Sequence, residues 1–183
     1  VVVFAASAGS GREPYASDGT AGGTVLLADL QAGTGSSNPG QFAVVGSEIW
    51  FAAGVTATGS ELYRTDGTPA GTALIADLTG GVFSTVPHAI TPFGNRVLFA
   101  GLFGGAGDEP CITDGTLAGS SLLEDINRPY SSSNPFDFRD LGALVYFAAG
   151  TDTSGIEPHA TDGTLAGTYR IADVQPGSFG SGP

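Results

Sequence analysis

Short apolar runs, four in each of four similar segments, set the pattern of this chain. The clearest set lies at residues 42–45, 49–53, 61–65 and 72–78. Gly46-Ser47 and Asp66-Gly67 separate two pairs of runs, and two-residue turns that contain glycine are typical of β-hairpins. No segment shows the apolar periodicity of an amphipathic helix. The pattern predicts four-stranded antiparallel meanders and no helix.

One motif recurs four times, and each copy begins 48 residues after the previous one. The copies are EPYASDGTAGGT from Glu13, ELYRTDGTPAGT from Glu61, EPCITDGTLAGS from Glu109 and EPHATDGTLAGT from Glu157. Four antiparallel strands in each period are typical of one blade of a β-propeller. Residues 97–100 are apolar in succession, which indicates a sheet that is packed on both faces. We therefore predict an all-β, four-bladed propeller in which residues 1–183 form one domain, with repeat units at about 1–48, 49–96, 97–144 and 145–183.

The chain is nine residues shorter than four full periods, and the alignment assigns this deficit to the first blade. Four periods of 48 residues would need 192, whereas the chain has 183, and the alignment places Val1 opposite Glu48. We therefore expect the first blade to lack its first strand. A strand edge left open in this way offers backbone donors and acceptors to a partner. The alternatives are a tolerated gap, an edge filled by a second chain or a ligand, and a ring completed by residues outside this sequence.

The motif E-[LP]-x-x-[ST]-D-G-T-x-x-G-[TS] resembles the ELWxxDGTxxGT repeat, including its EPW variant, of secreted and surface bacterial propeller-type proteins. The resemblance covers essentially the whole chain in four copies. It implies a propeller and a secreted or cell-surface location, but no single activity. The tryptophan of that family is replaced at all four positions here, by three kinds of side chain, at Tyr15, Tyr63, Cys111 and His159. Packing at this position must therefore differ between repeats, which allows a local void or a ligand niche.

Composition and charge narrow the function classes further. The net charge is −12, which opposes a nucleic-acid backbone, although twelve of the 18 acidic residues occupy three repeated positions and so belong to the repeat. No apolar run approaches the roughly 20 residues of a membrane-spanning helix. The chain lacks methionine, and we interpret it as a mature secreted or cell-surface segment cut from a longer precursor. Cys111 is the only cysteine, which excludes an internal disulfide and a cysteine-based zinc site.

The repeated Asp-Gly-Thr sequence is the most conspicuous candidate for chemistry. We interpret its aspartates as turn-forming residues, because aspartate accepts hydrogen bonds from its own turn and glycine adopts positive φ. The aspartates are Asp18, Asp66, Asp114 and Asp162. Dedicated calcium loops carry a much denser set of oxygen ligands, so we predict no metal site. A weak surface calcium site stays open as the alternative.

Catalytic and multivalent sugar-binding patterns are weak. His88 and His159 are the only histidines, and neither has a catalytic partner nearby in the sequence. We therefore expect a protein that is not an enzyme. Trp50 lies within a predicted strand, where it serves better as core between blades than as a stacking platform for sugars. This placement weakens the prediction of one sugar site in every blade.

The repeats differ most in the loops at one end of each predicted blade. Apolar side chains stand there at positions that are Gly, Ser or Thr in sister repeats, and variable loops on a repeated scaffold often carry function. The candidate ligand-binding residues are Val55, Phe83, Leu102, Phe103, Tyr130, Phe136 and Phe179. We predict a non-catalytic carrier of an apolar small molecule, such as an isoprenoid, a carotenoid-like pigment or a lipid, held at this rim or at a dimer interface. The alternatives are that these side chains cover the blade ends, or that the protein is an extracellular adhesion or carbohydrate-binding module.

Overall fold

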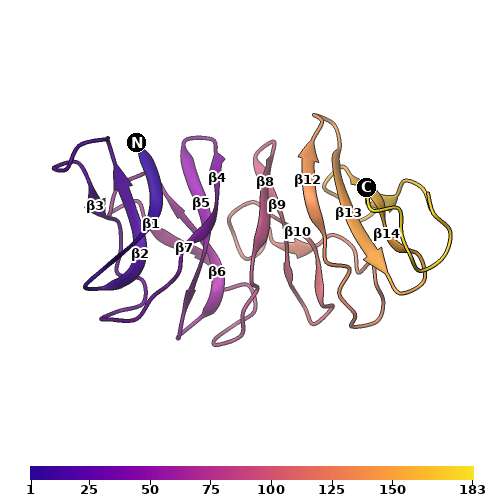
Figure 1. The fold of residues 1–183 in the computed structure, drawn as a ribbon, viewed down its shortest axis with the longest axis horizontal. Coiled ribbons are helices and arrows are strands. Elements are labelled where there is room, and N and C mark those ends of the chain that lie inside the picture. The colour runs from indigo at the N-terminus through magenta and orange to yellow at the C-terminus, as the bar shows by residue number, and fades with distance from the viewer. The chain divides into compact units, whose positions relative to one another are not determined.

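The computed structural model describes all residues from Val1 to Pro183 and consists of strands and their connections (Figure 1). The first sheet contains β1 (Val2–Ala8), β2 (Gly11–Ser17) and β3 (Val25–Leu26). The second contains β4 (Gly40–Val45), β5 (Glu48–Val55), β6 (Gly59–Thr65) and β7 (Ala73–Ala76). The third contains β8 (His88–Phe93), β9 (Arg96–Leu102), β10 (Asp108–Thr113) and β11 (Ser121–Leu122). The fourth contains β12 (Phe136–Asp140), β13 (Val145–Thr151), β14 (Gly155–Thr161) and β15 (Tyr169–Arg170).

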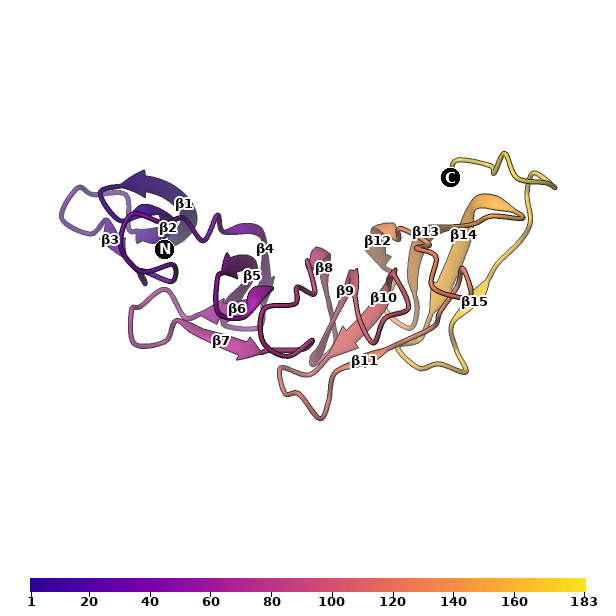
Figure 2. The ribbon, with the colours of Figure 1, turned by 90° about the horizontal axis from the view of Figure 1, so that it is seen from below.

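Each sheet is an antiparallel meander in which strands that follow one another in the chain are hydrogen-bonded neighbours (Figure 2). The apolar runs predicted from the second repeat coincide with β4, β5, β6 and β7, so the all-β repeated architecture is confirmed. The first sheet has only three strands, and β1 stands where the other sheets have their second strand. No helix is present, so none is long and apolar enough to cross a membrane.

The chain divides into two compact units. The first unit, Val1–Ile90, holds the first two sheets, and the second unit, Thr91–Pro183, holds the fourth sheet and nearly all of the third. The connection from the last strand of one sheet to the first strand of the next is called the crossing loop below. Because the strands form meanders, the crossing loop leaves each sheet at the same end as the loop between its second and third strands.

The core of each unit lies along the second strands of the sheets. In β5 the residues from Trp50 to Ala53 are buried in succession, and in β9 Val97, Leu98 and Phe99 are fully buried. Uninterrupted burial means that both faces of these strands are covered, as their uninterrupted apolar sequence predicts. Trp50 belongs to this core, and its indole N–H donates a hydrogen bond to Glu48.

Candidate functional site

The Asp-Gly-Thr motif forms a closed hydrogen-bonded turn. In the second repeat, Asp66 Oδ1 accepts the backbone N–H of Thr68 at 2.9 Å and its hydroxyl at 2.6 Å, and Thr68 Oγ1 accepts the N–H of Gly71. The other three repeats make the same three bonds. These bonds favour the charged form and lower the pKa of all four aspartates, at Asp18, Asp66, Asp114 and Asp162.

The second glycine of the motif makes room for the aspartate. A Cβ atom at Gly71 would lie 2.1 Å from Oδ1 of Asp66, and each of the other three repeats shows the same close approach. The aspartate is thus fully engaged within its own turn. No group of three or more His, Cys, Asp and Glu side chains lies close enough together to hold a metal ion.

The glutamate that opens each motif holds the crossing loop, a role that the sequence analysis did not assign. Glu61 is fully buried and accepts four hydrogen bonds, from the N–H groups of Leu78 and Thr85 and from the hydroxyls of Thr79 and Thr85. Burial raises the pKa of Glu61, and likewise that of Glu109, even though hydrogen bonds oppose the shift. A serine or threonine that stands 24 residues after each glutamate is the sequence signal, at Ser37, Thr85, Ser133 and Ser181.

A glycine two residues before each glutamate lets the crossing loop approach the third strand. Gly59 has a φ of 72°, and a Cβ atom there would lie 2.3 Å from the carbonyl oxygen of Phe83. The equivalent glycines are Gly11, Gly107 and Gly155, which also have positive φ. The repeated motif is therefore longer than the motif read from the sequence, since it begins at this glycine.

Most of the predicted ligand-binding residues point apolar surface toward solvent. Phe83, Tyr130 and Phe179 are 71%, 83% and 88% exposed. Leu102 and Phe136 are also exposed, whereas Val55 and Phe103 are half-buried. All seven lie in or beside the loops at the end of the sheets from which the crossing loops leave.

One of these residues borders a hollow. Phe136 lines a cavity of about 270 Å³ in the second unit, together with Ile156 and residues of the preceding crossing loop that include Ser133 and Asn134. Phe136 lies at the start of β12, and Ile156 lies in β14.

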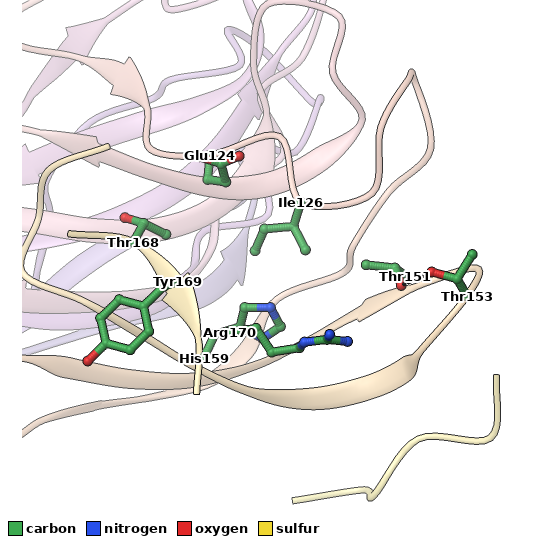
Figure 3. A pocket seen from close by; sticks show the side chains of 8 residues that line it. All are labelled: Glu124, Ile126, Thr151, Thr153, His159, Thr168, Tyr169 and Arg170. Atoms are coloured by element: carbon green, nitrogen blue, oxygen red, sulfur yellow. Dashed lines mark hydrogen bonds between the residues drawn. The ribbon is translucent and has the colours of Figure 1, made fainter. Parts of the chain in front are cut away.

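A larger cavity, of about 370 Å³, opens beside the fourth sheet (Figure 3). Its walls come from the crossing loop before that sheet, from the end of β13 and the loop after it, and from β14 and β15. The lining residues are Glu124, Ile126, Thr151, Thr153, His159, Thr168, Tyr169 and Arg170. His159 occupies the position at which the ELWxxDGTxxGT repeat has tryptophan, where the sequence allowed a void or niche.

The equivalent region of the second sheet is filled by apolar side chains. Phe51, Ala53 and Tyr63 form a buried cluster there, with Leu30 and Leu74 packed against it. A shift of 96 residues, which is two repeats, converts these positions into Phe147, Ala149, His159, Ile126 and Arg170. Tyrosine and leucine are thus replaced by histidine and arginine in the fourth sheet.

The cavity lining includes four side chains that no sister repeat has at the same position, namely Glu124, His159, Tyr169 and Arg170. Glu124 stands where the others have Ala28, Ala76 and Ala172, and Arg170 stands where they have Leu26, Leu74 and Leu122. His159 replaces Tyr15, Tyr63 and Cys111, and Tyr169 replaces Val25, Ala73 and Ser121. The exceptional polar residues of two adjacent repeats therefore meet at one cavity. Comparison of equivalent positions in the sequence could have found this set.

The environment of His159 fixes its tautomer. Nδ1 lies 2.9 Å from the carbonyl oxygen of Glu157, which can only accept, so Nδ1 carries the proton. The imidazole stacks on Phe147 with ring centroids 5.4 Å apart. Burial lowers the pKa of His159, so the ring is neutral near pH 7 and Nε2 is a hydrogen-bond acceptor.

The charged side chains of the cavity are each paired once. Arg170 lies opposite His159 in the antiparallel pairing of β14 with β15. The guanidinium of Arg170 forms an ion pair with the carboxylate of Asp173 at 3.4 Å. Glu124 forms an ion pair with Arg128 at 2.6 Å. Both pairs are partly exposed, so they are weak and leave part of each charged group available to a ligand.

Cys111, which occupies the same motif position in the third sheet, is fully buried, and burial raises the pKa of its thiol. It is therefore a poor nucleophile.

A scan against protein-family models found no match for this chain, and a search of curated proteins found no similar sequence.

Proposed function

We propose that the protein is a non-enzymatic binding protein that carries an apolar small molecule, such as an isoprenoid, a carotenoid-like pigment or a lipid. In this proposal the four sheets close into a four-bladed propeller of the ELWxxDGTxxGT type, and the protein is secreted or lies at the cell surface. The ligand lies against the exposed apolar side chains of the loops.

The exposure of three aromatic side chains supports this proposal. Phe83, Tyr130 and Phe179 present most of their surface to water, and the equivalent residues in at least one sister repeat are Gly, Ser or Thr. The scaffold therefore does not need aromatic rings at these positions. Apolar surface costs about 25 cal/mol per Å² when it stays in water, so a ligand that covers these rings gains a favourable contact.

The open edge of β1 offers a place for a second chain. β1 is an edge strand of the three-stranded first sheet, and its backbone groups on the open side lack a neighbouring strand of that sheet. Pairing of two copies there is the proposed route to a dimer. Sedimentation of the protein at high concentration tests this part, and a strictly monomeric protein would contradict it.

Ligand loading tests the apolar-carrier proposal directly. We expect the protein purified from its source to carry a bound apolar compound, seen as extra mass in native mass spectrometry. We also expect the unloaded protein to take up retinol or β-carotene from detergent with saturation. A colourless protein of bare polypeptide mass that takes up neither compound would overturn the proposal.

The repeats supply the variants and a matched control. Phe83→Ser and Tyr130→Thr introduce the residues found at Ser131 and Thr34, and together they should weaken retinol uptake several-fold. Leu117→Ala introduces the residue found at Ala21, and it removes an exposed leucine from the loop that follows an Asp-Gly-Thr turn. Equal retinol uptake by the native protein, the loop variants and the control would contradict the assignment of ligand binding to these loops.

A further inference from the structure

The cavity beside the fourth sheet has features that its structural role does not require. Three of the four repeats place leucine at the position of Arg170, and in the second sheet Leu74 packs against a buried aromatic cluster. An arginine at this position gives up that packing and leaves an open space of about 370 Å³. The volume falls within the range of small-molecule sites.

The polar groups around the cavity call for a ligand that both donates and accepts hydrogen bonds. Arg170 presents a planar set of donors that suits a carboxylate. Nε2 of His159 and the carboxylate of Glu124 accept hydrogen bonds, so they suit hydroxyl groups. Among the lining threonines, Thr151 and Thr168 already share their hydroxyls with neighbouring hydroxyl and backbone groups, whereas the hydroxyl of Thr153 makes one such bond and can make another.

Other classes of ligand fit this lining less well. A fully apolar ligand would displace water from Arg170, from Glu124 and from Nε2 of His159 without offering hydrogen bonds in return, at a cost for each. A phosphate carries up to about two negative charges near pH 7, so it would meet stronger repulsion from Glu124 and Asp173 than a single carboxylate does, with one arginine to offset it. A ring with several hydroxyls and a single carboxylate satisfies the whole set, and its C–H face can lie against Ile126.

We propose that this cavity binds an acidic monosaccharide, with the carboxylate of the sugar on Arg170 and its hydroxyls on His159 and Glu124. None of the seven predicted ligand-binding residues lines this cavity, although Thr151 also lines the neighbouring cavity that Phe136 borders, and the proposal does not depend on an apolar ligand. It gives the carbohydrate-binding alternative a definite place in the molecule.

Titration of the whole protein with sodium D-glucuronate, followed by calorimetry or by saturation-transfer NMR, tests the proposal. We expect saturable binding that weakens as salt is added, because the guanidinium contact is partly exposed. D-Glucose lacks the carboxylate, so it should bind at least about tenfold more weakly, which corresponds to the loss of one charged hydrogen bond.

The sister repeats again provide conservative variants. Arg170→Leu and His159→Tyr introduce the residues of the second repeat, which the scaffold accepts there, and each should reduce glucuronate affinity at least about tenfold. Arg139→Ala is the control, since it removes one positive charge from β12, outside the cavity lining, and introduces the residue found at Ala43. Thermal unfolding of each variant verifies that the fold is kept.

Three outcomes would overturn the proposal: no binding of glucuronate by the native protein, unchanged binding by Arg170→Leu, or equal binding of glucose and glucuronate. The Phe83→Ser and Tyr130→Thr variants should bind glucuronate normally. A failure of the sugar proposal can therefore be told apart from a failure of the apolar-carrier proposal.

Discussion

The second and fourth sheets share a backbone plan but differ at one face. In the second sheet Tyr63 stacks on Phe51, with ring centroids 5.8 Å apart, and Leu74 completes the cluster. In the fourth sheet His159 stacks on Phe147 in the same way, yet Arg170 replaces the leucine and a cavity opens.

This comparison distinguishes the residues that stabilise the sheet from the residues that determine what the face of the sheet can bind. The turn aspartate and the glycines keep their hydrogen bonds or close contacts in both sheets, and the buried glutamate keeps two equivalent hydrogen bonds. Side chains that face the preceding crossing loop carry none of these bonds, so they can change without loss of the turn. A repeat scaffold can in this way turn one packed face into a polar cavity through a few substitutions, here at Glu124, His159, Tyr169 and Arg170.

Replacement of the apolar cluster in the second sheet should have the largest effect on the free energy of unfolding. Tyr63→His combined with Leu74→Arg copies the fourth sheet and removes packed apolar volume, so we expect unfolding to become easier by about 4 kcal/mol. Trp50 is the only tryptophan and lies on the neighbouring strand β5, so its fluorescence during urea unfolding reports on this sheet. A loss below about 1 kcal/mol would mean that the cluster contributes little.

Substitution of Gly59, the glycine that lies against the crossing loop, should cause the second-largest loss of stability. Gly59→Ala places a methyl group against the carbonyl of Phe83 at positive φ, and we expect a loss of about 3 kcal/mol in urea unfolding. Gly54→Ala is the control in the neighbouring strand, because its Cβ would meet no atom closer than 3.8 Å. Similar losses in both variants would show that the close approach is not the cause.

The buried glutamates should show an intermediate effect that differs between the sheets. Glu61→Gln exchanges an acceptor oxygen for an N–H₂ group that faces donors, and we expect a loss of about 2 kcal/mol. Oε2 of Glu157 accepts hydrogen bonds from Val174 and Ser181, whereas its buried Oε1 has no hydrogen-bond partner, so Glu157→Gln should cost less. Equal losses of unfolding free energy in the two variants would contradict the inference that Glu61 holds the segment after its sheet more firmly than Glu157 does.

The effect of Glu61→Gln should also depend on pH. Because burial raises the pKa of Glu61, the folded protein holds this proton more tightly than the unfolded chain does, and the stability that this gives is lost as pH rises through the folded pKa. Glutamine does not titrate, so the loss caused by the variant should be larger near pH 4 than near pH 8. Urea unfolding at the two pH values measures the difference.

The smallest effect concerns His159. Burial lowers its pKa, so the unfolded chain binds the proton more tightly, and stability should fall as pH drops from the ordinary value of 6.5 through the folded pKa. His159→Tyr should flatten this part of the stability profile, whereas His88→Phe, which introduces the residue found at Phe136, should leave it in place. Thermal unfolding between pH 7 and pH 5 gives the slopes.

The repeat made much of the fold predictable. The period of 48 located every sheet, and the apolar runs located the strands, because each run had three sister copies to support it. The missing first strand followed from counting alone. What escaped prediction was the backbone between the runs. Asn38, Val86 and Asn134 have positive φ before proline, a conformation that the residue preceding proline normally avoids.

The candidate site was predictable only in part. The sequence pointed to the tryptophan position of the motif as a place where packing varies, and the larger cavity lies at one of its four copies, His159. The sequence favoured a buried Cys111, which the structure confirms, but it gave no way to tell that His159 borders open space. The difference depends on Glu124 and Arg170, which are distant in sequence from each other and meet only when β15 lies beside the crossing loop of the preceding repeat.

The hydrogen bonds between each buried glutamate and the segment after its sheet have a consequence for how the number of repeats can change. Each glutamate takes its hydrogen bonds from backbone and hydroxyl groups that come within the next 24 residues, so the bonds that bind a crossing loop belong to a single stretch of sequence. A gene segment that encodes one period therefore brings along all the partners for its own buried carboxylate. Duplication or deletion of whole periods leaves no buried charge stranded, and the number of repeats can vary in evolution at little energetic risk.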